Sequence, residues 1–143
     1  MKTISPDIIV RWHFLSPEDP GWKSMRCLYA YVAPNKKDIL YIGKCWGVTV
    51  KARWSRTAKE SFWNDLERKR KIAEHFALLG EVGLTYRGRL TNELLADVES
   101  LLIMGEQPWG NIQCKESRIP RPGLVVGCAG SWPGQARFYK DNA

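Results

Sequence analysis

The chain has 143 residues, of which 44% are hydrophobic, and this size and composition are typical of one domain with a buried core. Its apolar runs are far shorter than the roughly 18 residues of a membrane span, and the N-terminal residues show no secretory signal. Lysine and arginine number 22 against 15 acidic residues, which leaves a net charge of +7 and favours a polyanionic partner such as nucleic acid. We therefore expect a single cytoplasmic domain over residues 1–143 that does not contact a membrane.

The four cysteines and two histidines show no metal-binding pattern. No two cysteines have the close spacing of zinc ligands, and only His13 and His75 are available to complete a zinc site. Disulfides are rare in cytoplasmic proteins. We therefore expect reduced thiols, most of them structural, at Cys27, Cys45, Cys114 and Cys128.

The first part of the chain predicts three strands. Residues 8–15 are β-branched and aromatic and stop at the turn-forming stretch SPEDPG, so they predict a strand followed by a loop. Residues 26–32 and 39–42 predict a second and a third strand, which form an antiparallel hairpin around the turn at residues 33–38. Both strands of this hairpin carry tyrosines, in the stretches CLYAY and LYIGK.

Two helices are predicted next. Residues 48–56 favour a short helix. Residues 59–79 favour a longer helix, with apolar side chains at helical spacing and Gly80 in the position of a C-terminal cap. The apolar side chains of this predicted helix are Phe62, Leu66, Ala73, Phe76 and Ala77.

The last part of the chain predicts a strand, a helix and a loop-rich tail. Residues 81–90 alternate weakly, as a strand does. Thr91 is the predicted N-cap of a helix that ends near residue 104 or 105, with Glu93 in its first turn. The tail from residue 119 is rich in proline and glycine and predicts loops with one short strand at 124–126. These elements together predict an α+β domain.

One carboxylate stands out on the predicted helix over residues 91–104. At 100° per residue, Glu99 falls in the apolar arc between Leu95 and Ile103, whereas Asp97 falls among the polar positions. An unpaired buried charge is strongly unfavourable, so such a carboxylate must be paired, hydrogen-bonded or bound to a cation. The helix pattern leaves a structural salt bridge and a functional carboxylate both open.

Five elements of the sequence occur in a recognisable order: Cys27-Leu-Tyr29, Tyr41-Ile-Gly43, Arg53, Glu99 and Asn111. In this order they resemble the GIY-YIG nuclease family, whose signature has two tyrosine-bearing strands, a helix arginine, a glutamate on a later helix and a following asparagine. The resemblance implies a central antiparallel sheet of about three strands flanked by helices. It covers a core of about residues 26–111 and leaves an N-terminal extension at 1–25 and a loop-rich tail at 112–143.

The resemblance implies a metal-dependent endonuclease that hydrolyses DNA phosphodiester bonds. Tyr29 and Tyr41 would be the two phenols of the site, one of them acting as general base toward water. Arg53 would stabilise the scissile phosphate, and Asn111 would position the glutamate and its loop on the side where substrate binds. Glu99 would hold one Mg²⁺ or Mn²⁺ ion, because a hard ion with one carboxylate ligand keeps waters that substrate phosphate can replace.

Further residues are candidates for assisting catalysis or binding substrate. A tyrosine with a pKa near 10 is mostly protonated at pH 7, so Lys44 or Arg53 would have to favour its phenolate. Gly43 either allows close backbone approach or simply ends its strand. Trp46 is the candidate for stacking on a base or wedging a duplex. Arg56 and the basic run at 68–71 either contact phosphates or form a solvated helix face.

Departures from the family pattern bear on activity. Cys27 replaces the first glycine, and Thr57 stands where many family members carry a histidine or tyrosine. His75 would replace that group only if the fold brought it to the site, and a surface or core position is the simpler expectation. Two other interpretations therefore stay open: an inactive GIY-YIG fold that binds nucleic acid or a protein, and an unrelated α+β interaction protein.

The sequence does not choose the substrate further. DNA is the expected partner, and RNA stays open. No recognition module accompanies the core, which leaves weak specificity, structure-directed nicking, or targeting by a partner protein or a homodimer.

Overall fold

A mixed six-stranded sheet with helices makes up the part of the chain that the computed structural model describes, namely residues 6–54, 64, 67, 68, 75–108, 110, 111 and 123–141. The fold is therefore α+β, as the sequence predicts. In chain order the elements are β1 (Ile8–Phe14), the 3-10 helix η1 (Pro20–Lys23), β2 (Arg26–Val32), β3 (Ile39–Trp46), α1 (Val50–Trp54), β4 (Phe76–Leu84), α3 (Asn92–Glu106), β5 (Val125–Gly130) and β6 (Phe138–Lys140).

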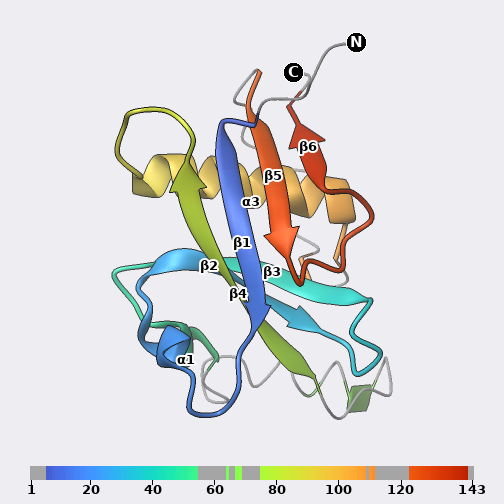
Figure 1. Cartoon of the computed structure of the whole chain (residues 1–143). Coiled ribbons are helices and arrows are strands. Elements are labelled where there is room, and N and C mark those ends of the chain that lie inside the picture. Colours follow the sequence, from blue (N-terminus) through green and yellow to red (C-terminus); the bar gives the residue numbers. More distant parts are fainter. Residues whose placement is uncertain are drawn as a thin grey trace.

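The sheet is larger than the expected three strands and is not purely antiparallel. Its strand order is β3-β2-β4-β1-β5-β6, and β1 pairs with β5 in parallel, whereas the other neighbours are antiparallel. The extra strands come from the N-terminal extension and the C-terminal tail, which both join the sheet of the central segment. Figure 1 shows the strong twist that turns β2 and β3 across the direction of β1 and β5, with α3 lying over one face.

The predicted long helix over residues 59–79 is wrong at its C-terminal end. Phe76 and Ala77 begin strand β4, and Gly80 is a residue of that strand and not a helix cap. β4 lies between β1 and β2, so its residues 77–80 are all buried. A short apolar run of this kind fits a buried central strand as well as a helix face. Of residues 55–74, the structure describes Asn64, Glu67 and Arg68, which are helical.

The C-terminal tail contains more strand than expected. β5 begins at Val125 and extends to Gly130, and β6 pairs with it. Aromatic packing joins this region to the core, because the Trp12 and Trp132 rings lie 4.6 Å apart between centroids. The Trp132 indole N–H is 3.1 Å from the Tyr139 hydroxyl, which accepts its hydrogen bond. The sequence did not predict the full length of these short strands, because the surrounding glycines and prolines are typical of loops.

Helix α3 agrees closely with the prediction. Thr91 is its N-cap, and the Thr91 hydroxyl accepts a hydrogen bond from the Leu94 amide at 3.1 Å. The helix ends at Glu106, and its C-cap residue Gln107 has a left-handed backbone with φ of 50°. In the part of the chain that the structure describes, no helix is long and apolar enough to cross a membrane.

The β2–β3 hairpin has two chemically different faces. On one, which we call the α3 face, apolar side chains of both strands pack with those of α3 in the main core; those from the hairpin are Leu28, Ala30, Val32 and Ile42. The opposite one, which we call the tyrosine face, packs in a second cluster together with Val50 of α1 and Leu79 of β4. The hairpin residues of the tyrosine face are Cys27, Tyr29, Tyr31, Tyr41, Gly43 and Cys45.

Candidate active site

Three tyrosine rings stack on the tyrosine face of the hairpin. Strand register pairs Tyr31 with Tyr41 and Tyr29 with Gly43. The ring centroids lie 5.5 Å apart for Tyr29 and Tyr31, 6.0 Å for Tyr29 and Tyr41, and 5.3 Å for Tyr31 and Tyr41. The structure therefore brings the two predicted phenols together and adds a third, Tyr31. A sequence signal for Tyr31 existed, since residues two apart in a strand share a face.

Gly43 is required by the ring of Tyr29. A side-chain carbon added at Gly43 would overlap the hydroxyl and the adjoining ring carbon of Tyr29. The glycine does not end the strand, because β3 continues to Trp46. The Tyr-Ile-Gly sequence thus has a packing explanation, in which the glycine leaves the space that a buried tyrosine on the neighbouring strand occupies.

Burial separates the three phenols chemically. Tyr29 and Tyr31 are 2% and 0% exposed, and burial is the main cause that holds the pKa of both well above its ordinary value. For Tyr31, the positive charge of Arg53 opposes that rise only in part. Both hydroxyls are therefore protonated at neutral pH and act as hydrogen-bond donors. Tyr41 is half-buried and is the one of the three that keeps contact with solvent.

Helix α1 carries Arg53 to the edge of the tyrosine cluster. The buried Val50 fixes the helix start, and its amide donates to the Ser24 carbonyl at 3.0 Å. At the other end of the helix, the Tyr31 hydroxyl donates a hydrogen bond to the Arg53 carbonyl oxygen at 3.4 Å. The Arg53 side chain is exposed. Its positive charge acts on Tyr31, and the exposed guanidinium is open to an anion from solvent.

Glu99 reaches the hairpin from the other side. It lies on α3, which packs on the α3 face, and its side chain is half-buried. The buried carboxylate of this helix is instead Asp97, at 4% exposed, and Ser100 is also buried. The helix pattern did not predict this, because α3 contacts β6 as well as β2 and β3 and is therefore covered on more than one side.

The charges of Arg53 and Glu99 both act on Cys45 in the edge strand β3. A hydrogen bond with Cys27 is the main cause that lowers the pKa of the Cys45 thiol, and burial opposes it. The positive charge of Arg53 lowers that pKa further, and the negative charge of Glu99 raises it. Both side chains therefore lie close enough to Cys45 to act on it, from opposite faces of the hairpin.

Asn111 fastens the segment after α3 to β3. Its side-chain carbonyl accepts a hydrogen bond from the Ile42 amide, and its side-chain amide donates to the Ile42 carbonyl, both at 2.8 Å. The neighbouring Gly110 amide donates to the Leu40 carbonyl at 2.7 Å. Asn111 is only 6% exposed. Its amide therefore pairs with the strand edge as a backbone would, which suits a positioning residue better than a substrate contact.

The remaining predicted residues lie further from the phenols. Lys44 pairs in register with Leu28, on the α3 face, and its ammonium donates to the Asn92 side chain at 2.9 Å. Trp46 ends β3 with the Arg26 guanidinium 4.7 Å from its ring centroid. Arg56 and Thr57, like most of the basic run at 68–71, are outside the residues that the structure describes.

His75 lies beside the tyrosine cluster, although the sequence favoured a surface or core position over a place near the site. Its ring centroid is 5.9 Å from that of Tyr31. Burial lowers the pKa of His75 to about 4, so the imidazole is neutral at pH 7. A neutral imidazole at this position can exchange a proton or a hydrogen bond with a neighbouring group.

A resident metal ion would have to bind through few protein ligands. Among the described residues, no group of three or more histidine, cysteine and acidic side chains is placed to hold one. Glu99 offers one hard oxygen ligand that solvent partly reaches. This fits an ion such as Mg²⁺, which keeps several waters and binds through one or two carboxylates together with substrate phosphates.

Comparison of the chain with protein-family models, with curated proteins and with solved structures found no match. The residues and their geometry therefore carry the functional assignment.

Proposed function

We propose that the protein is a metal-dependent endonuclease that hydrolyses DNA phosphodiester bonds through a GIY-YIG-type site, with residues 26–111 as the core of such a fold. One observation carries the proposal: Tyr29 and Tyr41 stack 6.0 Å apart on the hairpin, beside the helix that carries the exposed Arg53. The packing of Tyr29 against Gly43 supports the proposal, because it brings the two tyrosine motifs into direct contact.

Tyr41 is the better candidate for general base. A base must reach the attacking water and lose its own proton, and Tyr29 is buried with a raised pKa. Tyr41 is half-buried, so water can reach its hydroxyl, and the exposed Arg53 of α1 lies at the edge of the same cluster. In the reaction, the water oxygen would bond to phosphorus while its proton passes to the Tyr41 oxygen. The bond from phosphorus to the leaving oxygen would break, and that oxygen would take up a proton from solvent water.

Arg53 and a metal ion held by Glu99 would each stabilise the negative charge on the phosphate. The exposed Arg53 side chain is suited to pair with the phosphoryl oxygens, whose negative charge grows in the transition state. A divalent ion bound at Glu99 would supply charge stabilisation to the same group. Asn111 would keep the segment after α3 against the middle of β3, between Tyr41 and Gly43. The net charge of +7 would attract the polyanionic substrate.

A second candidate function is a nucleic-acid-binding fold without catalysis. Two observations favour it: Lys44 is held by Asn92 on the α3 face, and Glu99 comes from the face opposite the phenols. Such a protein would keep the basic surface and the tyrosine packing but would not assemble the chemistry.

Cleavage of supercoiled plasmid, with Mg²⁺, with Mn²⁺ or with EDTA, tests the proposal. We expect metal-dependent nicking that is lost in Glu99→Gln and kept in Glu93→Gln, which removes an equal charge from the exposed first turn of the same helix. Tyr41→Phe should lower the rate by about 10²–10⁴-fold, as loss of a general base does, and Tyr29→Phe should lower it less.

Two outcomes would contradict this assignment. Undiminished cleavage by Glu99→Gln would remove the metal carboxylate from the mechanism. A folded wild-type protein that binds DNA and never cleaves it would favour the binding fold instead.

A further inference from the structure

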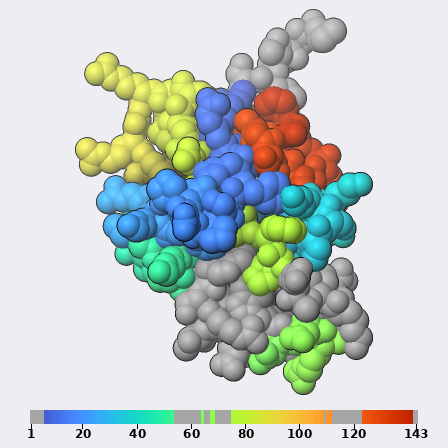
Figure 2. Space-filling model, turned by 60° about the horizontal axis from the view of Figure 1, so that its bottom comes forward, coloured from blue at the N-terminus to red at the C-terminus, as the bar shows by residue number. Residues whose placement is uncertain are grey.

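An open hollow of about 1200 Å³ lies beside the tyrosine face, outside the proposed catalytic site. Its walls come from the loop after β1, η1, the β2–β3 turn, α1 and the start of β4. In Figure 2 the blue N-terminal loop, the green-blue α1 and the yellow-green start of β4 are visible on the same face. The side chains that matter here are Phe14, Trp22, Phe76, Lys23, Lys36 and Lys51.

One wall of the hollow is aromatic and carries a cation. Phe14 and Phe76 meet edge to face with ring centroids 6.1 Å apart. The Lys36 ammonium lies 5.4 Å from the Phe14 ring centroid and 5.0 Å from that of Phe76. Phe76 is nevertheless 39% exposed. An exposed phenylalanine next to an ammonium group provides both a surface for stacking and a charge for a phosphate.

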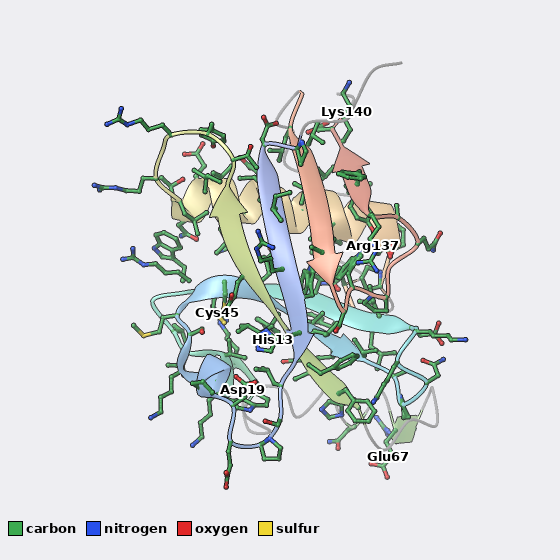
Figure 3. The ribbon with its side chains drawn as sticks, in the orientation of Figure 1. His13, Asp19, Cys45, Glu67, Arg137 and Lys140 are labelled. Carbon is green, nitrogen blue, oxygen red and sulfur yellow. The ribbon has the colours of Figure 1, made fainter. Side chains whose placement is uncertain are left out.

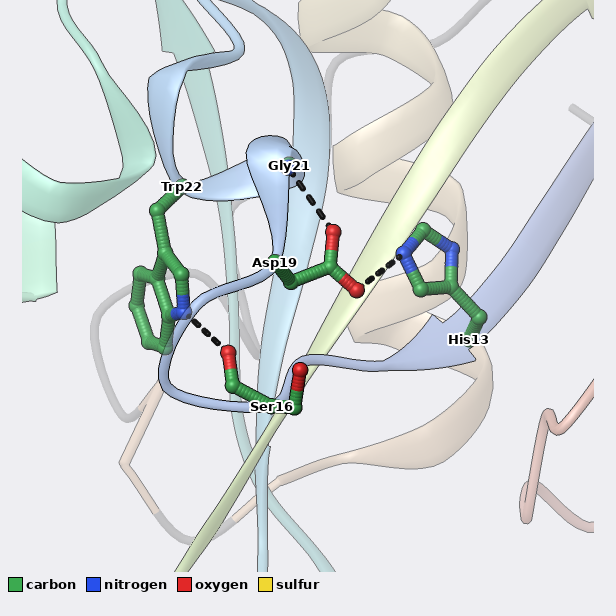
Figure 4. Close-up of polar contacts among 5 residues, drawn as sticks. All are labelled: His13, Ser16, Asp19, Gly21 and Trp22. Carbon is green, nitrogen blue, oxygen red and sulfur yellow. Dashed lines mark hydrogen bonds and ion pairs between the residues drawn. The ribbon is translucent and has the colours of Figure 1, made fainter.

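A second wall, formed by Trp22 and the loop before η1, is held in place by hydrogen bonds. The Trp22 indole N–H donates to the Ser16 carbonyl at 2.7 Å (Figure 4). The Asp19 carboxylate accepts from the Gly21 amide at 2.8 Å through one oxygen, and its other oxygen lies 3.5 Å from the His13 ring nitrogen. These contacts fix the indole ring and direct the Asp19 charge toward η1 and His13. The wall is therefore formed before any ligand binds.

The charge of the hollow favours an anion. Lys23, Lys36 and Lys51 come from three different elements and line it together, against the two acidic residues Glu18 and Asp19. All three lysine side chains are exposed. Lys51 also lies on α1, two residues before Arg53. The hollow is thus joined to the proposed phosphate-binding arginine through a single short helix.

We propose that this hollow binds an unpaired segment of a nucleic-acid strand, with bases against the aromatic walls and phosphates at the three lysines. Aromatic side chains interleaved with cations are the combination that binds single strands without sequence readout. A duplex hides its base faces, so it would not use the aromatic walls. The inference goes beyond the proposed nuclease, because strand binding requires neither metal nor hydrolysis.

Binding of a fluorescent oligothymidylate, measured by anisotropy in EDTA, tests this site apart from any cleavage. The variant Lys23→Gln/Lys36→Gln/Lys51→Gln should bind about tenfold more weakly. Its log–log dependence on salt should be shallower by about 2, since each lost phosphate contact removes about 0.7 from the slope for a single strand. The matched control is Arg87→Gln/Arg89→Gln/Lys140→Gln, which loses the same charge from exposed positions outside the hollow. Figure 3 shows Lys140 at the end of the molecule far from Asp19.

A second variant separates stacking from charge. Phe76→Ala removes an exposed ring without changing net charge, and we expect about tenfold weaker binding at an unchanged salt slope. Thermal unfolding of each variant confirms that it is folded. Equal weakening by the control triple variant, equal affinity for the matching duplex, or equal affinity for an acidic peptide would each overturn the proposal. If the folded wild-type protein binds the oligothymidylate but does not cleave plasmid, the proposed nuclease is overturned and the proposed strand-binding site is not.

Discussion

The two faces of the β2–β3 hairpin are built from alternate residues of the same strands and solve different problems. On the α3 face, Leu28 and Ile42 bury only apolar groups against α3. On the tyrosine face, Tyr29 and Tyr31 are buried just as completely but carry hydroxyls. Burying a polar group costs free energy unless a partner compensates, so an apolar face would stabilise the hairpin more simply. Tyr31 has such a partner in the Arg53 carbonyl, so the tyrosine face depends on hydrogen-bond geometry where the α3 face depends on apolar packing alone.

The largest expected change in stability is on the α3 face. Leu28→Ala should lower the free energy of unfolding by about 2–5 kcal/mol, because Leu28 is fully buried and its loss leaves a cavity in the main core. Urea unfolding followed by circular dichroism measures this. Met25→Ala, at a side chain 49% exposed, should change it by less than about 0.5 kcal/mol. A cost below about 1 kcal/mol for Leu28→Ala would mean that the α3 face does not hold the fold.

The next effect is on the tyrosine face and comes from adding a single methyl group. Gly43→Ala should cost about 1–3 kcal/mol, because the new carbon overlaps the buried Tyr29 ring. The control is Gly83→Ala in β4, where the nearest atom to such a carbon is the Ile9 carbonyl oxygen at 3.8 Å. Urea unfolding of the two variants should separate them clearly, and equal stability would show that Tyr29 has room to move.

A double-mutant cycle sharpens this result. In the Tyr29→Phe background, Gly43→Ala should cost less, since the hydroxyl is one of the atoms that the new carbon overlaps. Part of the cost should remain because the ring carbon is still there. Strictly additive costs would contradict the contact.

The strands and helices that the sequence could predict are those with local signals. The hairpin strand at 26–32 and the helix capped by Thr91 have the bounds or the cap that their residues indicate. Strand β4 was taken in part for a helix, because Ala77 to Gly80 are buried on both sides and lose the alternation of a half-buried strand. The pairing of β1 with β5 joins residues far apart in the chain and leaves no local pattern.

The candidate site was predictable in its parts and not in its arrangement. Tyr29, Tyr41 and Arg53 do lie around one cluster. That Lys44 points to the α3 face follows from strand register, since the residue two positions before it, Ile42, packs there too. Asp97 is buried and Glu99 only half-buried, although the helix pattern predicts the reverse, because α3 contacts β2, β3 and β6 and the helix sequence alone does not show which strands pack on it.

A smaller effect on stability is expected at Asn111, whose side chain is bonded to the edge strand β3 of the hairpin. Asn111→Ala should cost about 1–3 kcal/mol, because it leaves the Ile42 amide and carbonyl without their partners. We expect the lower part of this range, since β3 is an edge strand that water can approach. Asn35→Ala is the control: its side chain also accepts two backbone hydrogen bonds, but in an exposed turn. Hydrogen exchange should show faster exchange at Ile42 in Asn111→Ala alone.

The smallest effect is a pH dependence of stability, which tests whether His75 is shielded from water beside Tyr31. Burial lowers the pKa of His75 from 6.5 to about 4, so the folded protein holds the neutral imidazole more firmly than the unfolded chain does. Its contribution to stability is complete above pH 6.5 and is lost as the pH falls toward 4. Between these values the wild type should lose more stability than His75→Gln. An NMR titration, with the resonance assigned by its absence in His75→Gln, reports the same pKa directly. Titration of His75 near 6.5 would mean that water reaches this ring, and that the burial that raises the pKa of Tyr31 does not extend to its neighbour His75.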